Sequence, residues 1–511
     1  EDVELLYRSY KNSRFANLPE ILYGYREMRG GFRKRLHTRL GRVRYLKARQ
    51  ETTGRAMFYR AAIAEGAKTI FDAALVAASA RYAMLRAREE RLSAGETAAW
   101  SDVLETVSGK TAPLRLMMIT TIAETLGFFT RQIQLLAKSG FQVHAVCAPG
   151  GDHGGVEHLA GIAAHRVPMQ RRPDPAADCA SIGRLLRLMR RVRPDVVHAH
   201  TPKAGLLGMA AARIAGVPVR VYTIHGLPLM TRRGIWRRVL EAAERTSCAL
   251  ATRVYTVSPS LQQVVAELKL CPAEKLGTIG DGSCAGIDIE RFSLSIAASE
   301  RAVALRKDLG IPENAQVLSF MGRIARDKGV AILAAAWEDL SREFPKAHLV
   351  VAGIEDSSDP VPAAVLQELR AHDRVHFTAG WVRDMPALYA ATDIVVLPTF
   401  REGLSQVALE AGAMGVPIVS TRIPGLVNSV QDGVTGLLVS AGEVAPFADA
   451  VRRLLNDAAL QRALGSAARE YVAGRFSEQR VNQLWISEYR KLVSRSLPRI
   501  VNRLAHIETP R

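Results

Sequence analysis

The chain has 511 residues, a formal net charge of +19 and 48% hydrophobic residues. At about 150 residues per domain this length predicts about three globular units, and the apolar content excludes a disordered chain. The cysteines stand singly, which excludes a paired disulfide framework and indicates a reduced, cytosolic compartment; they are Cys147, Cys179, Cys248, Cys271 and Cys284.

The first 110 residues predict a mostly helical N-terminal extension. Residues 51–110 are Ala-rich and charged, and they predict a helical linker with no chemistry of its own. The apolar run 71–85 is shorter than the roughly 20 residues of a membrane helix, which favours a buried or interfacial helix. No charged-then-apolar leader follows Glu1, so no signal peptide is visible, and we expect the chain to be a fragment.

The positive charge is uneven along the chain. Residues 311–450 hold 10 Lys and Arg against 17 Asp and Glu, a balance of −7 that leaves +26 for the rest. The densest basic blocks are 29–49 and 183–193. Basic stripes suit nucleic acid, an anionic membrane surface or phosphorylated ligands, and the plainer alternative is a solvated helix face.

From residue 114 onward, short β-branched runs alternate with helical stretches. A first series contains LRLMMIT, QVHAVC, DVVHAH, VPVRVYTI and RVYTVS, and a second contains QVLSFMG, AHLVVAG, RVHFTAG, DIVVLP, PIVST and GLLV. Buried parallel strands joined by helices explain both series. The predicted fold class is α/β, with two Rossmann-like doubly wound domains facing a cleft at the carboxyl ends of their strands.

The predicted boundaries place a first Rossmann-like domain at 111–292 and a second at 293–476, joined near 287–312. The remainder, 477–511, predicts a crossover helix and tail. Its stretch 477–497 is amphipathic enough to pack across both domains.

In the second domain, FREGLSQVALEAGAMGVPIVST (400–421) carries two carboxylates, Glu402 in a loop and Glu410 in a helix from about Ser405 to Met414. Two carboxylates facing a pocket can accept hydrogen bonds from the hydroxyls of a sugar and a ribose. The helix amino end near Gly403 to Ser405 offers N–H groups to a phosphate. The alternative is a helix cap with a paired structural Glu.

A second loop, in SFMGRIARDKGVAIL (319–333), carries Arg323 and Lys328 beside the amino end of a helix. Together these cations can neutralise a diphosphate without a metal. Alone, such a loop is weak evidence, because solvated surface bases explain many of them.

In the first domain, HAHTPKAGLLG (198–208) and VYTIHGLPL (221–229) each end a strand with His and small residues. His200, Lys203 and His225 are therefore expected to point toward the cleft, although any single His is as well explained as a satisfied loop residue. The loop 120–129 is expected to bring Thr121 and Glu124 near an acceptor.

At this point the chain from 114 to about 490 resembles a retaining family 4 glycosyltransferase of the GT-B fold. The resemblance is carried by Gly322-Arg323 with Lys328-Gly329, by EGLSQVALEAGAMGVPIVST, QDGVTGLLV and GIDIERF, and by HTPKAGLLG with YTIHG. It implies retaining transfer from a nucleotide sugar, UDP- or GDP-linked, with no bound metal and no other cofactor.

Matching positions imply the roles of individual residues. Arg323 and Lys328 hold the donor diphosphate, and Glu402 contacts the donor sugar beside Gly403, Leu404 and Ser405. Glu410 holds the ribose, His225 lies beside the reacting carbon, and Gly380 to Val382 fall where such enzymes meet the base. The expected catalytic set is His225, Arg323, Lys328 and Glu402, with Thr121, Glu124, His200 and Lys203 on the acceptor side.

HTPKAGLLG and HGLPL further resemble the branch that extends lipid-linked oligosaccharides for capsule, O-antigen lipopolysaccharide or exopolysaccharide. This implies a lipid-linked or oligosaccharide acceptor and a cytoplasmic enzyme peripheral on the inner face of the plasma membrane. Membrane-borne acceptors would explain the basic first domain, and an anionic membrane surface is an expected partner, whereas nucleic acid is not expected, because the bases lack interleaved aromatics. Two departures are the missing double glycine in the first loop and Asn428 where a Glu is common.

Residues 1–50 resemble the carboxyl-terminal end of a family 2 glycosyltransferase of the GT-A fold. The stretch 1–27 carries this resemblance, and Glu1-Asp2 would then be the end of an active site whose other half lies upstream. The alternative is an unrelated basic helical extension that touches a membrane.

Two rival functions stay open. A GT-B epimerase would act on the nucleotide sugar itself, without needing the two glutamates. A non-catalytic nucleotide-sugar-binding protein would keep Arg323 and Lys328 yet release no nucleotide.

Overall fold

The computed structural model describes residues 113–151, 155–159, 161–170, 174–380 and 382–504, with side chains as far as Ser496. These residues belong to one unit, Pro113–Arg511. The predictions for the extension 1–50, the linker 51–110, the basic block 29–49 and the end of the tail lie outside the described residues.

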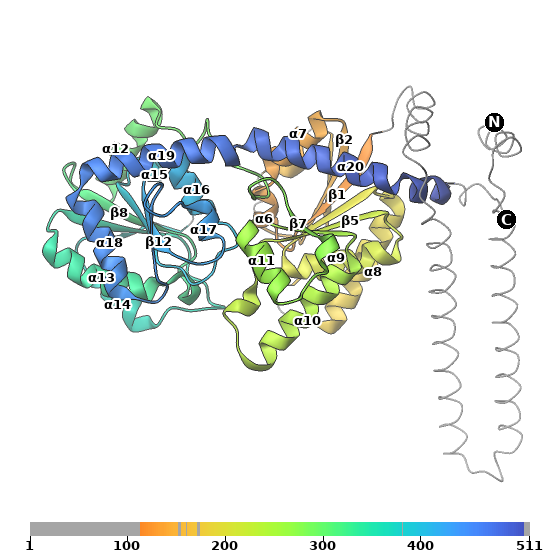
Figure 1. Cartoon of the computed structure of the whole chain (residues 1–511), viewed down its shortest axis with the longest axis horizontal. Coiled ribbons are helices and arrows are strands. Elements are labelled where there is room, and N and C mark those ends of the chain that lie inside the picture. The colour runs from red at the N-terminus through yellow and green to blue at the C-terminus, as the bar shows by residue number, and fades with distance from the viewer. Residues whose placement is uncertain (1–112, 152–154, 160, 171–173, 381, 505–511) are drawn as a thin grey trace, which may run out of the picture. The chain divides into compact units, whose positions relative to one another are not determined.

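The first sheet has seven parallel strands in the order β3-β2-β1-β4-β5-β6-β7 (Figure 1). Its central strands bury both faces, which is why they read as nearly unbroken apolar runs. The strands are β1 (Leu114–Ile119), β2 (Phe141–Cys147), β3 (Ile162–Arg166), β4 (Val196–His200), β5 (Val219–Ile224), β6 (Arg253–Thr256) and β7 (Leu276–Thr278).

The second sheet has six parallel strands in the order β10-β9-β8-β11-β12-β13. Its central strands are also apolar because both of their faces are covered, and β9 and β11 are buried along their whole length. The strands are β8 (Gln316–Met321), β9 (Ala347–Ala352), β10 (Val375–Phe377), β11 (Ile394–Leu397), β12 (Ile418–Thr421) and β13 (Leu437–Val439).

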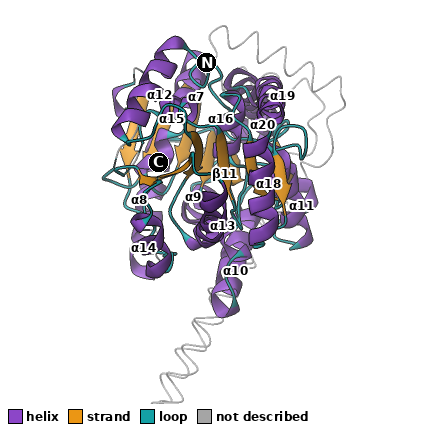
Figure 2. Ribbon diagram, turned by 90° about the vertical axis from the view of Figure 1, so that its left-hand side faces the viewer, coloured by secondary structure: helices purple, strands orange, loops and turns teal. Residues whose placement is uncertain are grey.

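Helices join successive strands and cover the sheets (Figure 2). The first sheet with its helices is called the first lobe, and the second sheet with its helices the second lobe. Those of the first lobe are α6 (Ala123–Gly127), α7 (Thr130–Lys138), α8 (Pro175–Val192), α9 (Pro202–Ile214), α10 (Gly234–Leu250) and α11 (Pro259–Glu267), with the 3-10 turns η1 (Val156–His158), η2 (Pro228–Met230) and η3 (Ala273–Lys275). Those of the second lobe are α12 (Ile296–Asp308), η4 (Arg326–Lys328), α13 (Val330–Glu343), α14 (Ala363–Ala371), α15 (Met385–Ala390), α16 (Gln406–Ala413), α17 (Leu426–Ser429), α18 (Val444–Asn456) and α19 (Ala458–Phe476). Within the described residues, no helix is long and apolar enough to span a membrane.

These two sheets confirm the predicted pair of Rossmann-like domains. In each sheet the strand order reverses beside the first strand, between β1 and β4 and between β8 and β11. Ligands of doubly wound sheets bind at such switch points, outside the carboxyl ends of the strands. The sequence missed β3, a partly exposed edge strand, and β7, which has three residues and too short an apolar pattern to stand out.

The C-terminal helices divide between the two lobes. Phe476 at the end of α19 is buried in the second hydrophobic core, whereas Trp485 and Tyr489 of α20 (Glu478–Leu504) are buried in the first. The chain crosses at Ser477, which pairs with Ile287 in an isolated bridge. The helix expected at 477–497 is α20, a single helix, and it runs along the first lobe (Figure 1), whereas α19 before it packs in the second. The domain boundaries themselves stay a prediction.

Candidate active site

A group of neighbouring imidazoles lies at the carboxyl ends of β4 and β5, with His225 the partly exposed one. His200 is the last residue of β4 and is fully buried, and His225 follows directly after β5. Nδ1 of His200 lies 3.0 Å from Nε2 of His225, and the ring of Phe129 packs 4.4 Å from that of His200. The two histidines expected at the cleft are therefore in direct contact.

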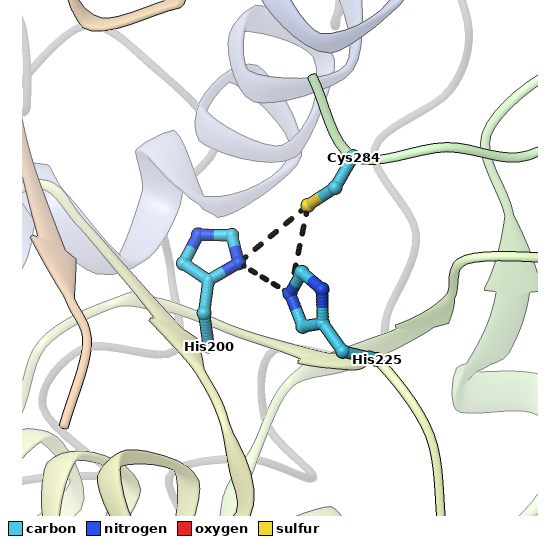
Figure 3. Close-up of side chains that lie close together, drawn as sticks. All are labelled: His200, His225 and Cys284. Carbon is cyan, nitrogen blue, oxygen red and sulfur yellow. Dashed lines mark hydrogen bonds between the residues drawn. The ribbon is translucent and has the colours of Figure 1, made fainter. Parts of the chain in front are cut away.

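Burial keeps both imidazoles neutral. It lowers the pKa of His225 to about 4 and that of His200 well below its ordinary value. One ring must donate the shared proton and the other accept it. The thiol of Cys284, from the loop after β7, lies 3.6 Å from Nδ1 of His200 and 3.7 Å from Nε2 of His225 (Figure 3). Burial raises the pKa of this thiol.

His198, two residues earlier on the same face of β4, anchors this group from behind. Its Nδ1 lies 2.6 Å from the hydroxyl of Tyr489, and its Nε2 lies 2.7 Å from the hydroxyl of Thr223. Both ring nitrogens are thus occupied. α20 therefore fixes the strand that carries His200.

The other residues expected on the acceptor side are less close together. The hydroxyl of Thr121 is 2.6 Å from that of Thr201, so the loop after β1 meets the loop after β4. Glu124 is exposed on α6. Lys203, at the start of α9, is 2.6 Å from a carboxylate oxygen of Asp178 on α8.

In the second lobe, Lys328 and Glu402 form a direct ion pair. Nζ of Lys328 lies 2.5 Å from Oε1 of Glu402, and both side chains are mostly buried, with 16% and 13% of their surface exposed. They follow β8 and β11, the two strands at the switch point of this sheet. The two motifs identified in the sequence therefore converge on one place.

Asp327 links the same two loops. Its carboxylate, 4% exposed, accepts from Arg401 at 2.5 Å and from Arg323 at 3.3 Å. Arg323 also pairs with Asp356, and its side chain stays 40% exposed. A buried carboxylate between two guanidinium groups is fully compensated, so Asp327 holds both loops in place.

Gly329 explains why the loop of Lys328 turns where it does. Its φ is +74°, a conformation that a side chain disfavours, and a Cβ here would lie 1.8 Å from the carbonyl oxygen of Pro398. The backbone after Lys328 thus touches the end of β11. A glycine is required for this approach.

Glu410 lies on α16. It accepts a hydrogen bond of 3.1 Å from the hydroxyl of Tyr389. Burial raises its pKa to about 7, against the opposing effects of Tyr389, Gln406 and Arg291. A carboxyl group with this pKa changes its charge near neutral pH.

The remaining residues expected around the donor have mainly packing and capping contacts. Ser405 caps α16 by accepting from the N–H of Ala408, and its own N–H donates to Ser429, so one N–H that was expected to be free has a partner. Leu404 packs against both hydrophobic cores. Val382 packs at the edge of the second core.

The lobes meet at the loops that carry His225 and Glu402. A Cβ on Gly403 would lie 1.8 Å from the carbonyl oxygen of His225, so the two backbones touch. The hydroxyl of Ser258 donates to the carbonyl of Gly403 at 2.6 Å. This contact brings His225 of the first lobe beside Glu402 of the second.

A second contact between the lobes involves Asn428, the position where the sequence departs from its expected family. Its Oδ1 accepts from the N–H of Ser260 at 3.0 Å and from the hydroxyl of the same serine. That hydroxyl also accepts from the N–H of Gly425 at 2.7 Å. Asn428 thus helps to hold the lobes together.

Two family descriptions match this chain. "Glycosyltransferase Family 4" matches residues 129–283, and "Glycosyl transferases group 1" matches residues 315–457. A D-inositol 3-phosphate glycosyltransferase of Saccharomonospora viridis is 31% identical over 348 residues, 64% of this chain and 78% of the relative. The chain belongs to glycosyltransferase family 4.

Two further relatives of this family 4 glycosyltransferase cover more of it. The capsular polysaccharide biosynthesis glycosyltransferase CapM of Staphylococcus aureus is 28% identical, over 75% of this chain and 98% of the relative. An Escherichia coli UDP-Gal:alpha-D-GlcNAc-diphosphoundecaprenol alpha-1,3-galactosyltransferase is 26% identical, over 69% of this chain and 89% of the relative. The crystal structure of Anabaena HepE with UDP-glucose shares the fold, with 22% identity and a TM-score of 0.62 over 74% of this chain and 99% of HepE.

The sequence did not single out several residues that make contacts in the site of this family 4 glycosyltransferase. Asp327 stands between Arg323 and Lys328 in the quoted motif, so its acidic character was a usable signal. Ser258 and Ser260 gave no signal in the sequence, because their hydrogen-bond partners lie far along the chain in the other lobe. Cys284 was a single cysteine with no neighbouring ligand in the sequence.

Proposed function

We propose that this enzyme transfers a sugar, with retention of configuration, from a UDP- or GDP-linked donor to a lipid-linked saccharide acceptor. The observation that carries the proposal is the contact of His225 with Gly403 beside the Lys328–Glu402 pair. Groups suited to the diphosphate, the sugar and the reacting carbon then come from two lobes to one place. The acceptor hydroxyl attacks the anomeric carbon as the bond to the β-phosphate breaks, and the departing phosphate takes the hydroxyl proton.

In this proposal Lys328 and Arg323 stabilise the charge that grows on the leaving diphosphate. A cation about 4 Å from a phosphate oxygen is worth about 4 kcal/mol at an effective dielectric of about 20. A diphosphate would compete with Glu402 for the ammonium of Lys328. The released carboxylate is then available to accept hydrogen bonds from the donor sugar.

The remaining roles are those that the matching positions of the family imply. Glu410 holds the ribose, and Val382 lies near the base. His200 acts through His225, whose ring it positions by their shared hydrogen bond. Thr121 and Glu124 line the acceptor side, where we also place Lys203, held by Asp178.

The acceptor class is supported by the relatives. The Escherichia coli relative acts on a diphosphoundecaprenol-linked sugar, and CapM serves capsular polysaccharide synthesis. We therefore place this enzyme in cell-surface polysaccharide synthesis, on the cytoplasmic side of the membrane. The Saccharomonospora viridis relative supplies the contrasting acceptor class, a small inositol phosphate.

An exposed surface on α10 supports binding to an anionic membrane. Ile235, Trp236 and Val239 are 68%, 58% and 45% exposed, and the arginines around them are exposed as well; these are Arg232, Arg233, Arg237 and Arg238. Tryptophan favours the membrane interface, and each basic residue near an anionic leaflet contributes about 1 kcal/mol. α10 lies toward the lower edge of the described residues in Figure 2.

Vesicle sedimentation tests this surface. We expect the chain to pellet with vesicles of anionic phosphatidylglycerol and not with neutral phosphatidylcholine. Trp236→Ser together with Arg237→Ala and Arg238→Ala should reduce pelleting. Ile296→Ser, which removes an apolar side chain 81% exposed on α12, should leave it unchanged. Equal pelleting of all variants would exclude α10 as the docking surface.

The transfer itself is tested with purified enzyme, a panel of UDP- and GDP-sugars, and two acceptors, a lipid-diphosphate saccharide and inositol phosphate. We expect nucleotide release that depends on the lipid-linked acceptor and a product that keeps the donor's anomeric configuration by NMR. Donor binding without nucleotide release would favour the non-catalytic alternative. A changed sugar nucleotide without a transfer product would favour the epimerase. Inversion at the anomeric carbon would refute retention.

A further inference from the structure

We propose that His200, His225 and Cys284 form a binding site for one Zn²⁺ ion, and that the bound ion inhibits the enzyme. Their ligand atoms, Nδ1, Nε2 and Sγ, all lie within 4.8 Å of one another (Figure 3). The side chains come from the carboxyl ends of β4 and β5 and from the loop after β7. The inhibitory part of the proposal rests on the function proposed above, whereas the binding part does not.

The distances between these atoms fit the edges of a zinc tetrahedron. With Zn–N of about 2.0–2.1 Å and Zn–S of about 2.3 Å, tetrahedral angles separate two nitrogens by about 3.3 Å and a nitrogen from a sulfur by about 3.6 Å. The observed separations are 3.0 Å between the nitrogens and 3.6 and 3.7 Å from them to the sulfur. One ion fits with shifts of a few tenths of an ångström.

The ligand types select among metals. Imidazole and thiolate ligands suit zinc, whereas magnesium and manganese prefer carboxylate, carbonyl and water oxygens. His198 cannot complete the set, because both of its ring nitrogens already bond to Tyr489 and Thr223. The fourth position is therefore left to water, as in other three-ligand zinc sites.

The loop of Cys284 is held in position for this role. The carbonyl of Cys284 accepts a hydrogen bond of 2.8 Å from Gln132. The nearby Gly282 packs against the backbone of Val257, where a Cβ would lie 2.4 Å from the carbonyl oxygen. The sulfur is therefore held near the two imidazoles without a metal, which reduces the entropic cost of binding.

The second ring nitrogen of His200 limits the affinity of the site for zinc. Nε2 of His200 is buried with no hydrogen-bond partner among the described residues. Histidine ligands normally donate this second N–H to a neighbouring group, and losing such a partner weakens metal binding about 10- to 100-fold. We therefore expect reversible zinc binding, weaker than at a structural zinc site. Zinc would also engage His225, the residue placed beside the reacting carbon.

Cobalt titration of the metal-free full chain tests the binding. We expect one Co²⁺ per chain, with the visible bands of tetrahedral cobalt and a near-ultraviolet thiolate-to-cobalt band. Zn²⁺ should displace it, and Mg²⁺ should not. Cys284→Ser should abolish the thiolate band, whereas Cys179→Ser, at an exposed cysteine, should keep it. A double variant of Cys248 and Cys271 to Ser should also keep it.

Circular dichroism and melting temperature establish that each variant is folded. An unchanged thiolate band in folded Cys284→Ser, or no tetrahedral spectrum in the original chain, would overturn the site.

The inhibitory role is measured separately, with donor, acceptor and added Zn²⁺. Turnover should fall at least tenfold and recover with EDTA, and Cys284→Ser should resist zinc. If the site is shown to be occupied and added Zn²⁺ does not lower turnover, the proposed inhibition is wrong. Absence of turnover without zinc would instead count against the proposed transfer.

Discussion

Replacing Gly403 by alanine tests whether transfer depends on the contact between the lobes at the loop of Glu402. A Cβ at this position would lie 1.8 Å from the carbonyl oxygen of His225 and 3.0 Å from a methyl carbon of Val257. The φ of Gly403 is outside the left-handed region, so alanine would not strain its own backbone. The free-energy cost of the substitution therefore comes from the contact between the lobes.

The structure gives the size of this cost. The added carbon is 1.2 Å short of the 3.0 Å below which such contacts are essentially never found, so the backbones of Gly403 and His225 must move apart. Four hydrogen bonds beside it would be lost: one from Ser258 to Gly403, one from Gly425 to Ser260, and two from Ser260 to Asn428. At about 0.5–1.5 kcal/mol each, the loss is about 2–6 kcal/mol. The equilibrium constant that favours lobes in contact should fall by about 30-fold to 10⁴-fold.

The assay is steady-state transfer with saturating donor and acceptor. We expect kcat to fall at least tenfold, while the melting temperature changes less, because the lost hydrogen bonds lie between the lobes and Val257 is the one core residue that the added carbon meets. Gly474→Ala in α19, where a Cβ has no atom within 4 Å, is the matched control and should keep its kcat. Gly403→Ala with kcat within twofold of the original enzyme would refute the reasoning.

Three further predictions follow from individual contacts. Arg323→Ala should lower kcat far more than Glu410→Ala, which should mainly raise the donor KM, and equal losses of kcat would contradict these roles. Burial raises the pKa of Glu410 to about 7, so the carboxylate is lost as the pH falls through 7, and the donor KM should rise there in the original enzyme but not in Glu410→Gln. Gly329→Ala should lower the melting temperature and kcat together, because its Cβ would lie 1.8 Å from the carbonyl of Pro398; Gly310→Ala, with a similar φ of +69° and no atom within 4 Å, separates this contact from backbone strain.

The two parallel sheets were predictable because each central strand buries both faces and therefore appears as a run of β-branched and apolar residues. β7 was missed because three residues give no pattern, and β3 because an edge strand is only partly buried. The sequence placed the start of the last helix at 477, but it did not show that this helix packs on the first lobe. A single amphipathic stretch does not reveal which core it covers.

The candidate site was predictable only in its parts. The loop of Lys328 and the loop of Glu402 each showed a local signal, but their ion pair at 2.5 Å joins residues 74 positions apart. Contacts such as that of Asn428 with Ser260, 168 positions apart, leave no trace in local composition.

The sequence by itself determined the fold class and the strand ends that carry chemistry, because burial and strand periodicity act over a few neighbouring residues. Only the tertiary structure decided which of those ends meet. It placed His225 against Gly403 and brought Cys284 to the two histidines. The physical reason is that hydrogen bonds, ion pairs and metal ligands act over a few ångströms in space, regardless of their separation along the chain.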